Sequence, residues 1–403
     1  MTFYRRDVMK TVTAVAVCLL GSLAWAGGHH EPVNPTTLPL RCGVVDPAPT
    51  PLPERIEVDL VICLDTSGSM TALIDSARAR LWDIVNEFGK AKPIPKLRVA
   101  LLTYGSPNLA GAAQGFVVRQ IDLTSDLDSV YEKMMSMSTN GGAEFVGWVL
   151  NDAVRTLSWS SDPKALRLIY VVGNESADQA AERFNFRQVS QLATGRDIII
   201  NAIYAGNRAQ GIKEMWQAVA QYGGGTYAAI EMDAGTYQIP APQDAMLQKL
   251  NIELNVTYVP FGAKGKEGRK KQLAQDDNAA RMGEQSANSR TVAKATAMYS
   301  NSAWDLVDAA AEKDFRFESV EEEALPEAMR SMTIQEREAY VGGMRAARGA
   351  VQNKIKKLSK ARDEFLKKER SRLKTGDKTS LDDALLESIR KHAEKKGFKF
   401  SDK

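Results

Sequence analysis

One carboxylate and two hydroxyls stand close together in the segment Asp65-Thr-Ser67-Gly-Ser69. Carboxylate and hydroxyl oxygens are hard donors, and three of them in this D-x-S-x-S pattern suit a divalent cation such as Mg2+ or Mn2+. The same residue types also stabilise turns and helix N-termini without any metal, because their side chains accept hydrogen bonds from backbone N–H groups. The segment therefore predicts a candidate cation site, with a turn or helix cap as the alternative.

The flanking residues predict the elements that would position this site. The apolar, β-branched run that begins at Val58 predicts a buried strand of a parallel sheet over 58–66. Apolar residues at helical spacing follow over 71–89. In open α/β sheets, ligands bind beyond the carboxyl ends of the strands. Asp65 stands at such an end, so the predicted elements favour the cation interpretation.

Further strands and helices alternate along the next part of the chain. The patterns predict strands at 97–104, 115–122, 165–172, 197–204 and 226–230, and helices at 125–136, 144–157, 211–221 and 243–255. The first two of these strands form a hairpin, which gives one antiparallel strand. The remaining alternation requires crossover connections, so the fold class is α/β: a mainly parallel sheet with helices on both faces.

This order, together with D-x-S-x-S, resembles a von Willebrand factor type A (VWA) domain over about residues 56–240. The resemblance implies a Rossmann-like sheet and a metal-ion-dependent adhesion site that uses Asp65, Ser67 and Ser69. In that family a Thr from a second loop and an Asp after the fourth main strand complete the site. Here Ala143 stands at the Thr position and Asn174 at the Asp position.

Losing a hydroxyl and a carboxylate should weaken cation binding, because affinity follows the number and charge of the ligands. Thr139 lies four residues before the usual Thr position, and Asn174 still offers an amide oxygen. Glu144 or Glu175 would restore the lost charge if its loop pointed inward. The alternative is a VWA scaffold that keeps the loop shape and binds cation weakly or not at all.

The composition argues against most enzymes. The only histidines are His29, His30 and His392, at the extremities of the chain, and no general base with a positioned nucleophile can be assigned. With a formal net charge of +3, the chain has no excess charge that calls for nucleic acid. We therefore expect a non-enzymatic protein whose cation accepts a carboxylate from a partner protein, as the resemblance implies.

The first 26 residues predict export. Arg5-Arg6 and Lys10 precede an apolar run over 11–23 and the sequence Ala24-Trp25-Ala26, a pattern that resembles a twin-arginine signal peptide. The run is shorter than the ~20 residues that span a bilayer, so we expect a cleaved signal and no transmembrane helix in the mature chain. An uncleaved form would be tethered to the inner membrane. The mature protein is expected in the periplasm, beginning with a Pro-rich leader over 27–55.

Cys42 and Cys63 are the only cysteines beyond the signal. A disulfide between them is chemically permitted outside the cytoplasm, but the position of Cys63 inside a strand favours two free thiols.

Two regions follow the VWA-like segment. Residues 241–317 are polar and basic, and predict a partly helical connection that is either solvated or a mobile linker. Residues 318–403 are helical, with a capping box at Thr333–Glu336. Their apolar seam supports a coiled-coil hairpin, a dimer through self-association, or packing on a neighbouring helix. The seam consists of Val351, Ile355, Leu358, Arg362 and Phe365.

The C-terminal half also resembles that of exported bacterial VWA-domain proteins. The resemblance rests on residues 258–261 and 304–308, on the helix beyond Thr333, and on Gly173-Asn174-Glu175 in the third loop. It implies no activity. The sequence thus predicts an exported binding or scaffolding protein with a degenerate adhesion site. The alternative is a metal-free structural envelope protein whose helical tail carries the interaction.

Overall fold

A computed structural model describes residues 55–400 apart from 108–109, 181, 231–238 and 374–380. The signal peptide, the leader, His29, His30 and Cys42 therefore lie outside the described residues. The chain divides into Met1–Pro51 and Leu52–Lys403, and all that follows concerns the second unit. Within its described part, no helix combines the length and apolarity needed to cross a membrane.

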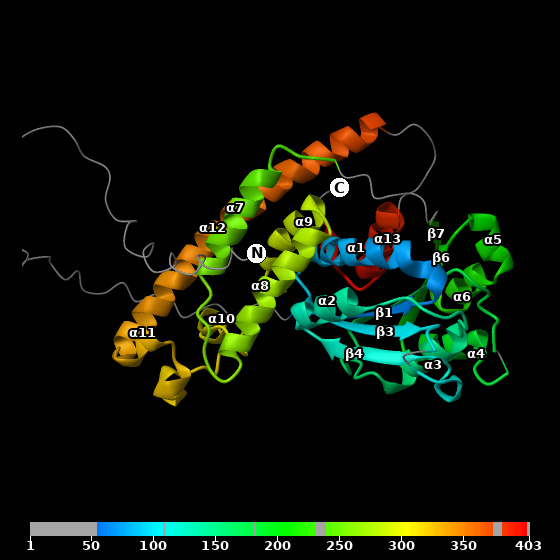
Figure 1. Cartoon of the computed structure of the whole chain (residues 1–403), viewed down its shortest axis with the longest axis horizontal. Helices are drawn as coiled ribbons and strands as arrows, with labels where there is room; N and C mark the ends of the chain where they lie inside the picture. Colours follow the sequence, from blue (N-terminus) through cyan, green and yellow to red (C-terminus); the bar gives the residue numbers. More distant parts are fainter. Residues whose placement is uncertain (1–54, 108–109, 181, 231–238, 374–380, 401–403) are drawn as a thin grey trace, which may run out of the picture. The chain divides into compact units, whose positions relative to one another are not determined.

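A six-stranded sheet forms the centre of this unit, in the order β4-β3-β1-β5-β6-β7 (Figure 1). Its strands are β1 (Glu57–Asp65), β3 (Lys96–Tyr104), β4 (Val118–Thr124), β5 (Leu166–Gly173), β6 (Ile198–Ala205) and β7 (Gly224–Ile230). Only β4 runs antiparallel to its neighbour; the other neighbouring strands are parallel. The predicted α/β fold class and the predicted hairpin are confirmed.

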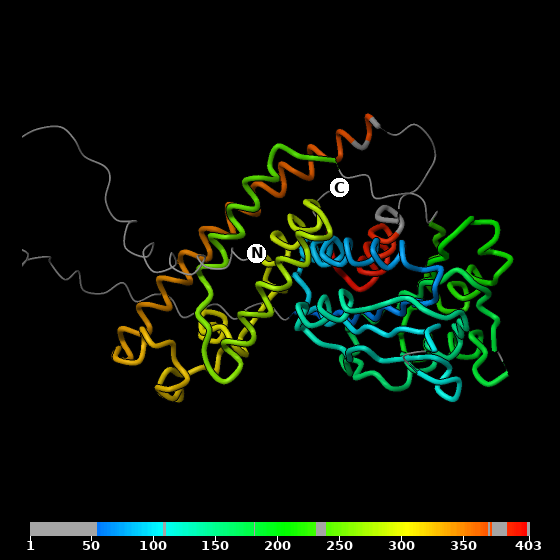
Figure 2. Tube along the Cα trace, in the orientation of Figure 1, coloured from blue at the N-terminus to red at the C-terminus, as the bar shows by residue number. Residues whose placement is uncertain are grey.

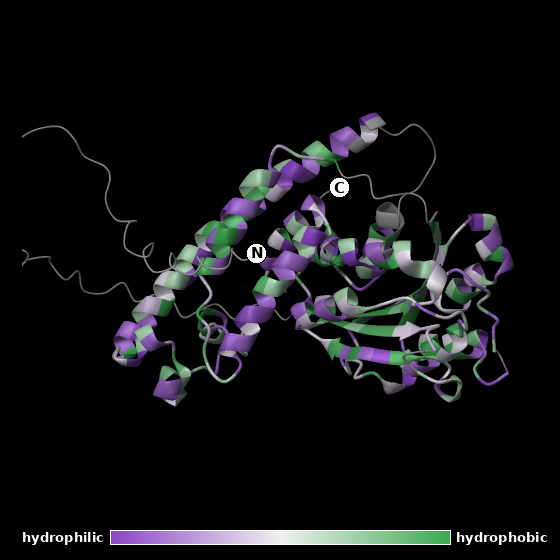
Figure 3. Cartoon of the chain, in the orientation of Figure 1, coloured by the Kyte–Doolittle hydropathy of each residue, from purple (hydrophilic) through white to green (hydrophobic). Residues whose placement is uncertain are grey.

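Strand β1 is buried on both faces because its side chains alternate between two cores. Leu60, Ile62 and Leu64 belong to one apolar cluster, and Val61 and Cys63 to the other. Helices cover both faces, as predicted. The first cluster includes side chains of α1 (Thr71–Gly89) and α2 (Leu127–Ser136), and the second those of α3 (Val146–Thr156), α4 (Phe186–Thr194) and α6 (Trp216–Tyr222). Figure 3 shows the central strands largely in green, whereas the edge strand β4 also carries hydrophilic residues in purple.

Two helices differ from their predictions. Helix α4 was not predicted, although Asn185 caps it and Phe186, Val189 and Ala193 bury one face. The predicted helix over 211–221 is two helices, α5 (Arg208–Lys213) and α6. Met215 separates them with a φ of +67°, a left-handed conformation that cannot continue a right-handed helix.

The C-terminal half is helical. It contains α7 (Asp244–Val256), α8 (Gly265–Arg281), α9 (Glu284–Lys294), α10 (Leu306–Ala309), α11 (Glu327–Arg330), α12 (Ile334–Leu373) and α13 (Leu381–Lys395). The predicted capping box of α12 is confirmed: the Thr333 N–H donates to Glu336 Oε2 at 2.8 Å, and the Glu336 N–H donates to Thr333 Oγ1 at 3.3 Å.

The seam of α12 packs within the chain. Val351 and Ile355 share an apolar cluster with Leu247, Leu250 and Leu254 of α7, and the two helices lie side by side (Figure 2). Arg362, the charged member of the seam, donates to Asp244 at 2.6 Å at the start of α7. Of the three arrangements that the sequence left open, the structure shows packing on a neighbouring helix.

The last helix returns to the sheet. Leu385, Ile389 and Ala393 of α13 belong to the same apolar cluster as β1 and α1. Beyond α13, the short strand β8 (Lys399–Phe400) pairs with β2 (Ala91–Lys92), which follows α1 directly. The predicted domain boundary at residue 240 did not anticipate this contact. The end of the chain covers part of the apolar core on one face of the six-stranded sheet.

Parts of the polar connecting region are buried. Arg290 donates to Asp128 of α2 and to Asp276 of α8, each at 2.6 Å, and Lys294 donates to Asp276 at 2.8 Å. Arg290 and Lys294 are at most 1% exposed. Residues 265–294 thus dock on the VWA-like part through a buried ionic cluster, and the expectation of a solvated helix or mobile linker is wrong there.

Candidate functional site

Three loops meet beyond the carboxyl ends of β1 and β5. The first loop is anchored at Thr66, whose backbone N–H and Oγ1 both donate to the Tyr104 carbonyl, at 2.8 and 2.9 Å. The second loop joins the first through two backbone hydrogen bonds. The Asn140 N–H donates to the Thr66 carbonyl at 2.9 Å, and the Gly68 N–H donates to the Gly141 carbonyl at 3.2 Å. These bonds fix the D-x-S-x-S segment without using the side chains of Asp65, Ser67 or Ser69.

Asp65 is fully buried at the end of β1. Its Oδ1 accepts the Ser67 N–H at 2.7 Å, an Asx-type turn, while its Oδ2 has no hydrogen-bond partner. The hydroxyls of Ser67 and Ser69 lie 3.2 Å apart, and the amide of Asn174 in the third loop donates to Ser69 Oγ at 2.9 Å. The structure therefore brings Asp65, Ser67, Ser69 and Asn174 together.

Glu144 is the carboxylate that completes this group. It is 2% exposed, its backbone N–H donates to Gln179 Oε1 at 3.3 Å, and its Oε2 has no hydrogen-bond partner. Burial, and then the adjacent Glu144 carboxyl, raise the pKa of Asp65 well above its ordinary value. Burial also raises the pKa of Glu144. The pair therefore disfavours the charge on Asp65, whereas the hydrogen bond with Asp65 favours the charge on Glu144 and partly offsets its burial.

Gly105 allows this approach. Its φ is +86°, and a Cβ at this position would lie 2.7 Å from Asp65 Oδ1 and 3.4 Å from Glu144 Cγ. Any other residue would therefore intrude between β3 and the carboxyl pair. Ala143, the residue at the usual Thr position, forms an isolated backbone bridge with Gly105, so the second loop presents Glu144 to the site.

The side-chain hydrogen bonds of two other predicted residues lead away from the carboxyl pair, although the charge of Glu175 still raises the pKa of Glu144. The Thr139 hydroxyl is 2.8 Å from that of Thr71 at the start of α1. Glu175 is exposed, and its carboxylate accepts from Gln179 at 3.4 Å. Its backbone carbonyl accepts the Trp216 indole N–H at 2.7 Å, which ties the third loop to α6.

The residues present fit a cation. Asp65 Oδ2, Glu144 Oε2 and Asn174 Oδ1 are buried acceptor oxygens from three different loops, and each lacks a hydrogen-bond partner when both carboxyls are ionised. A proton on Asp65 would join the two carboxyls by a hydrogen bond. Buried acceptors of this kind are costly unless they are paired, and a divalent ion would satisfy them while neutralising two carboxylates. This site has two carboxylates and no His or Cys. Among the described residues, no cluster of three or more His, Cys, Asp or Glu side chains could hold a metal ion.

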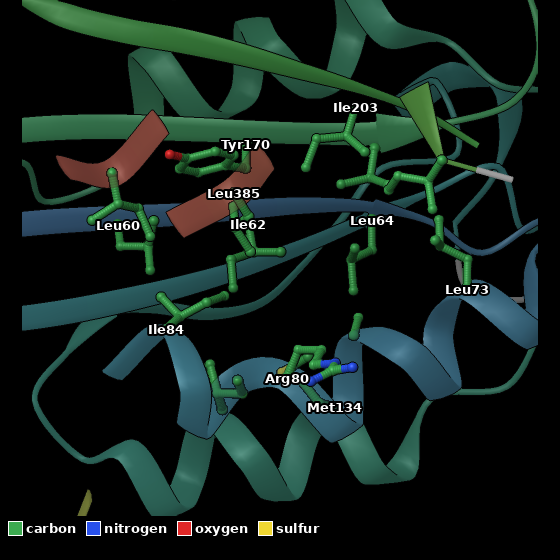
Figure 4. Close-up of a pocket in the computed structure, with 15 residues that line it drawn as sticks. Leu60, Ile62, Leu64, Leu73, Arg80, Ile84, Met134, Tyr170, Ile203 and Leu385 are labelled. Carbon is green, nitrogen blue, oxygen red and sulfur yellow. The ribbon is translucent and has the colours of Figure 1, made fainter. Parts of the chain in front are cut away.

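An apolar cavity of about 50 Å3 lies between the sheet, α1 and α13 (Figure 4). Its lining includes Leu60, Ile62, Ile84, Leu385 and Ile389. Two polar residues also line it, but Arg80 pairs with Asp83 and Tyr170 donates to Ser388, each at 3.0 Å. The remaining lining is apolar, so the cavity is a packing gap beneath α13 and not part of the site.

No protein-family model and no curated protein matches this chain. Among solved structures it is similar to a von Willebrand factor type A structure from Catenulispora acidiphila, with 15% identity, coverage of 44% of this chain and 39% of that chain, and a TM-score of 0.34. It is also similar to proximal thread matrix protein 1 from the mussel byssus with a zinc-occupied MIDAS motif, at 14% identity, with coverage of 45% of this chain and 43% of that chain and a TM-score of 0.35. A third similar structure is the SpRpn10 VWA domain, at 15% identity, with coverage of 48% of this chain and 95% of that chain and a TM-score of 0.33. The chain thus spans about two fifths of the length of the mussel and Catenulispora chains. These values support no statement about activity.

Proposed function

We propose that this chain is an exported, non-enzymatic binding or scaffolding protein that recognises a partner protein at the three-loop site, with Mg2+ or Mn2+ bound there. Asp65 and Glu144 would supply the charged ligands, Asn174 an amide oxygen, and Ser67 and Ser69 hydroxyl oxygens. Glu144 would thus supply the charge that the sequence pattern lacks at residue 174.

Three buried oxygens without partners, on three loops that hydrogen bonds hold together, carry this proposal. A mere turn or helix cap would leave the polar atoms of the segment satisfied locally, as Asp65 Oδ1 is. Asp65 Oδ2, Glu144 Oε2 and Asn174 Oδ1 instead belong to three adjoining loops and have no local partner when the carboxyls are ionised, which favours a ligand that accepts electron pairs.

A binding role accords with the chemistry around the carboxyl pair. The nearby hydroxyls bond to each other and to Asn174, and no imidazole adjoins them among the described residues. His392 is buried against Asn201 of β6, at 3.0 Å. The groups that adjoin Ser67 are the carboxyls of Asp65 and Glu144, and this proposal assigns them to the cation and not to a general base.

Capture of a partner from a periplasmic extract tests the proposal. Immobilised mature protein should retain a specific partner in Mg2+ and lose it in EDTA, and Asp65→Ala should lose it in both. Asp75→Ala, which removes a half-exposed carboxylate on α1, is the matched control and should behave like the wild type. Equal retention by Asp65→Ala and wild type would contradict a role for the site.

Export is tested separately. Residues 1–26 fused to a reporter protein should direct it to the periplasm, and Arg5→Lys together with Arg6→Lys should retain it in the cytoplasm. If the unmodified segment left the reporter in the cytoplasm, the proposal that this protein is exported would be overturned.

A further inference from the structure

A cluster of half-buried aromatic rings adjoins the candidate cation site. Phe116 precedes β4, Phe145 and Trp148 lie on the first turn of α3, and Phe184 precedes α4. The ring centroids of Phe116 and Phe145 are 5.5 Å apart, those of Phe145 and Trp148 6.3 Å, and those of Trp148 and Phe184 4.8 Å. We call these four side chains the aromatic shelf. They are neither in the core nor fully exposed, so they offer apolar area at the surface.

The shelf is continuous with the site. Phe145 directly follows Glu144, whose backbone N–H donates to Gln179, five residues before Phe184. A Cβ on Gly147 would lie 1.8 Å from the Phe184 carbonyl oxygen, so the segment before α4 packs directly on the first turn of α3. The second loop therefore presents Glu144 to the site and Phe145 to the shelf.

An exposed arginine lies on the shelf. The Arg183 guanidinium carbon is 4.7 Å from the Trp148 ring centroid and 5.5 Å from that of Phe184. No carboxylate among the described residues pairs with Arg183, whereas the nearby Arg187 pairs with Asp178 at 2.6 Å. A guanidinium that stacks on rings keeps its N–H donors available for a planar, bidentate acceptor such as a carboxylate.

We propose that the aromatic shelf and Arg183 form a second subsite for the partner, and that the partner segment is acidic. One carboxylate of that segment pairs with Arg183, and an apolar side chain beside it covers the shelf. This proposal deepens the function proposed above and rests on it: a cation at Asp65 and Glu144 and the Arg183 guanidinium select the same charge from two neighbouring positions.

Selection from a phage-displayed library of random dodecapeptides tests the inference. The library is selected on the folded mature protein in Mg2+, and enriched peptides are synthesised and measured by fluorescence anisotropy. We expect a consensus that contains acidic residues next to an aromatic or aliphatic residue. Arg183→Glu should weaken binding of these peptides at least about tenfold, since a charge-assisted bidentate contact becomes a repulsion.

Arg208→Glu is the matched control. Arg208 is also exposed and lies over a ring, with its guanidinium carbon 5.1 Å from the Tyr227 centroid, but it belongs to α5. The Arg208→Glu variant should bind the peptides within about twofold of the wild-type affinity, because Arg208 lies outside the proposed peptide contact. Failure to enrich acidic peptides, or equal binding to Arg183→Glu and wild type, would overturn the second subsite.

The cation arm separates this inference from the proposed function. Peptides that require Arg183 and also lose binding in EDTA support both proposals. Peptides that require Arg183 but bind equally in EDTA and to Asp65→Ala support the subsite and contradict the cation-dependent function. Peptides that lose binding in EDTA but bind Arg183→Glu as they bind the wild type support the cation-dependent function and contradict the subsite.

Discussion

At the scale of single residues, Glu144 changes the interpretation of the site most. The sequence assigned Asp65, Ser67, Ser69 and Asn174 to one candidate site, and the structure brings them together. The sequence could not choose between Glu144 and Glu175. The choice depends on which way the second and third loops turn, and that is set by the Gly105–Ala143 bridge and by the Trp216–Glu175 hydrogen bond. Such tertiary contacts leave no local pattern in the sequence.

Replacing Glu144 by Gln should have opposite effects on stability and on cation binding. Without cation, the variant relieves the repulsion between two buried carboxyl groups, so we expect its free energy of unfolding to rise by about 1 kcal/mol. With cation, loss of a charged ligand should weaken Mg2+ binding about tenfold or more. Thermal unfolding in EDTA and in Mg2+ measures both effects. Glu175→Gln is the exposed control, and equal Mg2+ stabilisation of Glu144→Gln and wild type would exclude Glu144 as a ligand.

At the scale of elements, the sequence predicted most of the sheet because each strand carries its own apolar run. It missed α4, and it could not show that a polar segment would be buried. Arg290 and Lys294 lie in a sequence that is typical of a solvated helix. Their burial is tolerated because Asp128 of α2 and Asp276 of α8 pair with their charges. Charge pairing between distant segments is not visible in local periodicity.

The ionic cluster should be sensitive to loss of one member. Burial alone would raise the pKa of Asp276, but the charges of Lys294 and Arg290 outweigh burial and hold it below its ordinary value. Asp276→Asn leaves these buried cations undercompensated, so we expect a loss of about 3 to 5 kcal/mol in the free energy of unfolding. The control is Glu253→Gln, whose partner Lys354 lies 3.7 Å away at the surface and should matter by less than about 0.5 kcal/mol. Equal unfolding midpoints in urea for the two variants would refute a structural role of the cluster.

The contact of α13 with the sheet should depend on pH through His392. Burial, assisted by Lys395 and Lys391, lowers the pKa of His392 to about 4. The unfolded chain binds the proton below about 6.5, so stability should fall as the pH drops from 6.5 towards 4, by roughly 3 kcal/mol. Urea unfolding at several pH values measures this loss. His392→Gln should remove this part of the pH dependence, and an unchanged slope in the variant would show that other groups cause it.

At the scale of the whole molecule, the helical region is inserted into the α/β fold built on the six-stranded sheet and does not simply follow it. Helices α7 to α12 lie between β7 and α13 in the chain, while α13 and β8 pack against the sheet and β2. The packing of α13 on the sheet could not be predicted from the sequence. The apolar face of α13 carries no local pattern that specifies strands about 200 residues earlier as its partner. The hydrogen bonds from Ser388 to Asn201 and from Tyr170 to Ser388, both at 3.0 Å, join these distant segments.

Removal of residues 381–403 should therefore destabilise the sheet and not merely shorten the tail. The deletion exposes the apolar cluster that Leu385, Ile389 and Phe398 now cover, so we expect aggregation or loss of cooperative unfolding. Ile389→Ala, a single truncation at a fully buried position, should cost about 2 to 4 kcal/mol. A deletion variant that unfolds at the same temperature as the full chain would contradict the assignment of α13 to this core.

Calorimetric titration of the mature protein with Mg2+ and with Mn2+, beside Asp65→Ala, tests the central claim most directly. We predict a single binding event in the wild type that releases protons, because the pKa of Asp65 is raised and the cation displaces a proton from the carboxyl pair. Asp65→Ala should show no binding heat while retaining the wild-type circular dichroism spectrum. A wild type that gives no metal-dependent heat, or an Asp65→Ala variant that binds as the wild type does, would contradict the claim that these loops form a cation site.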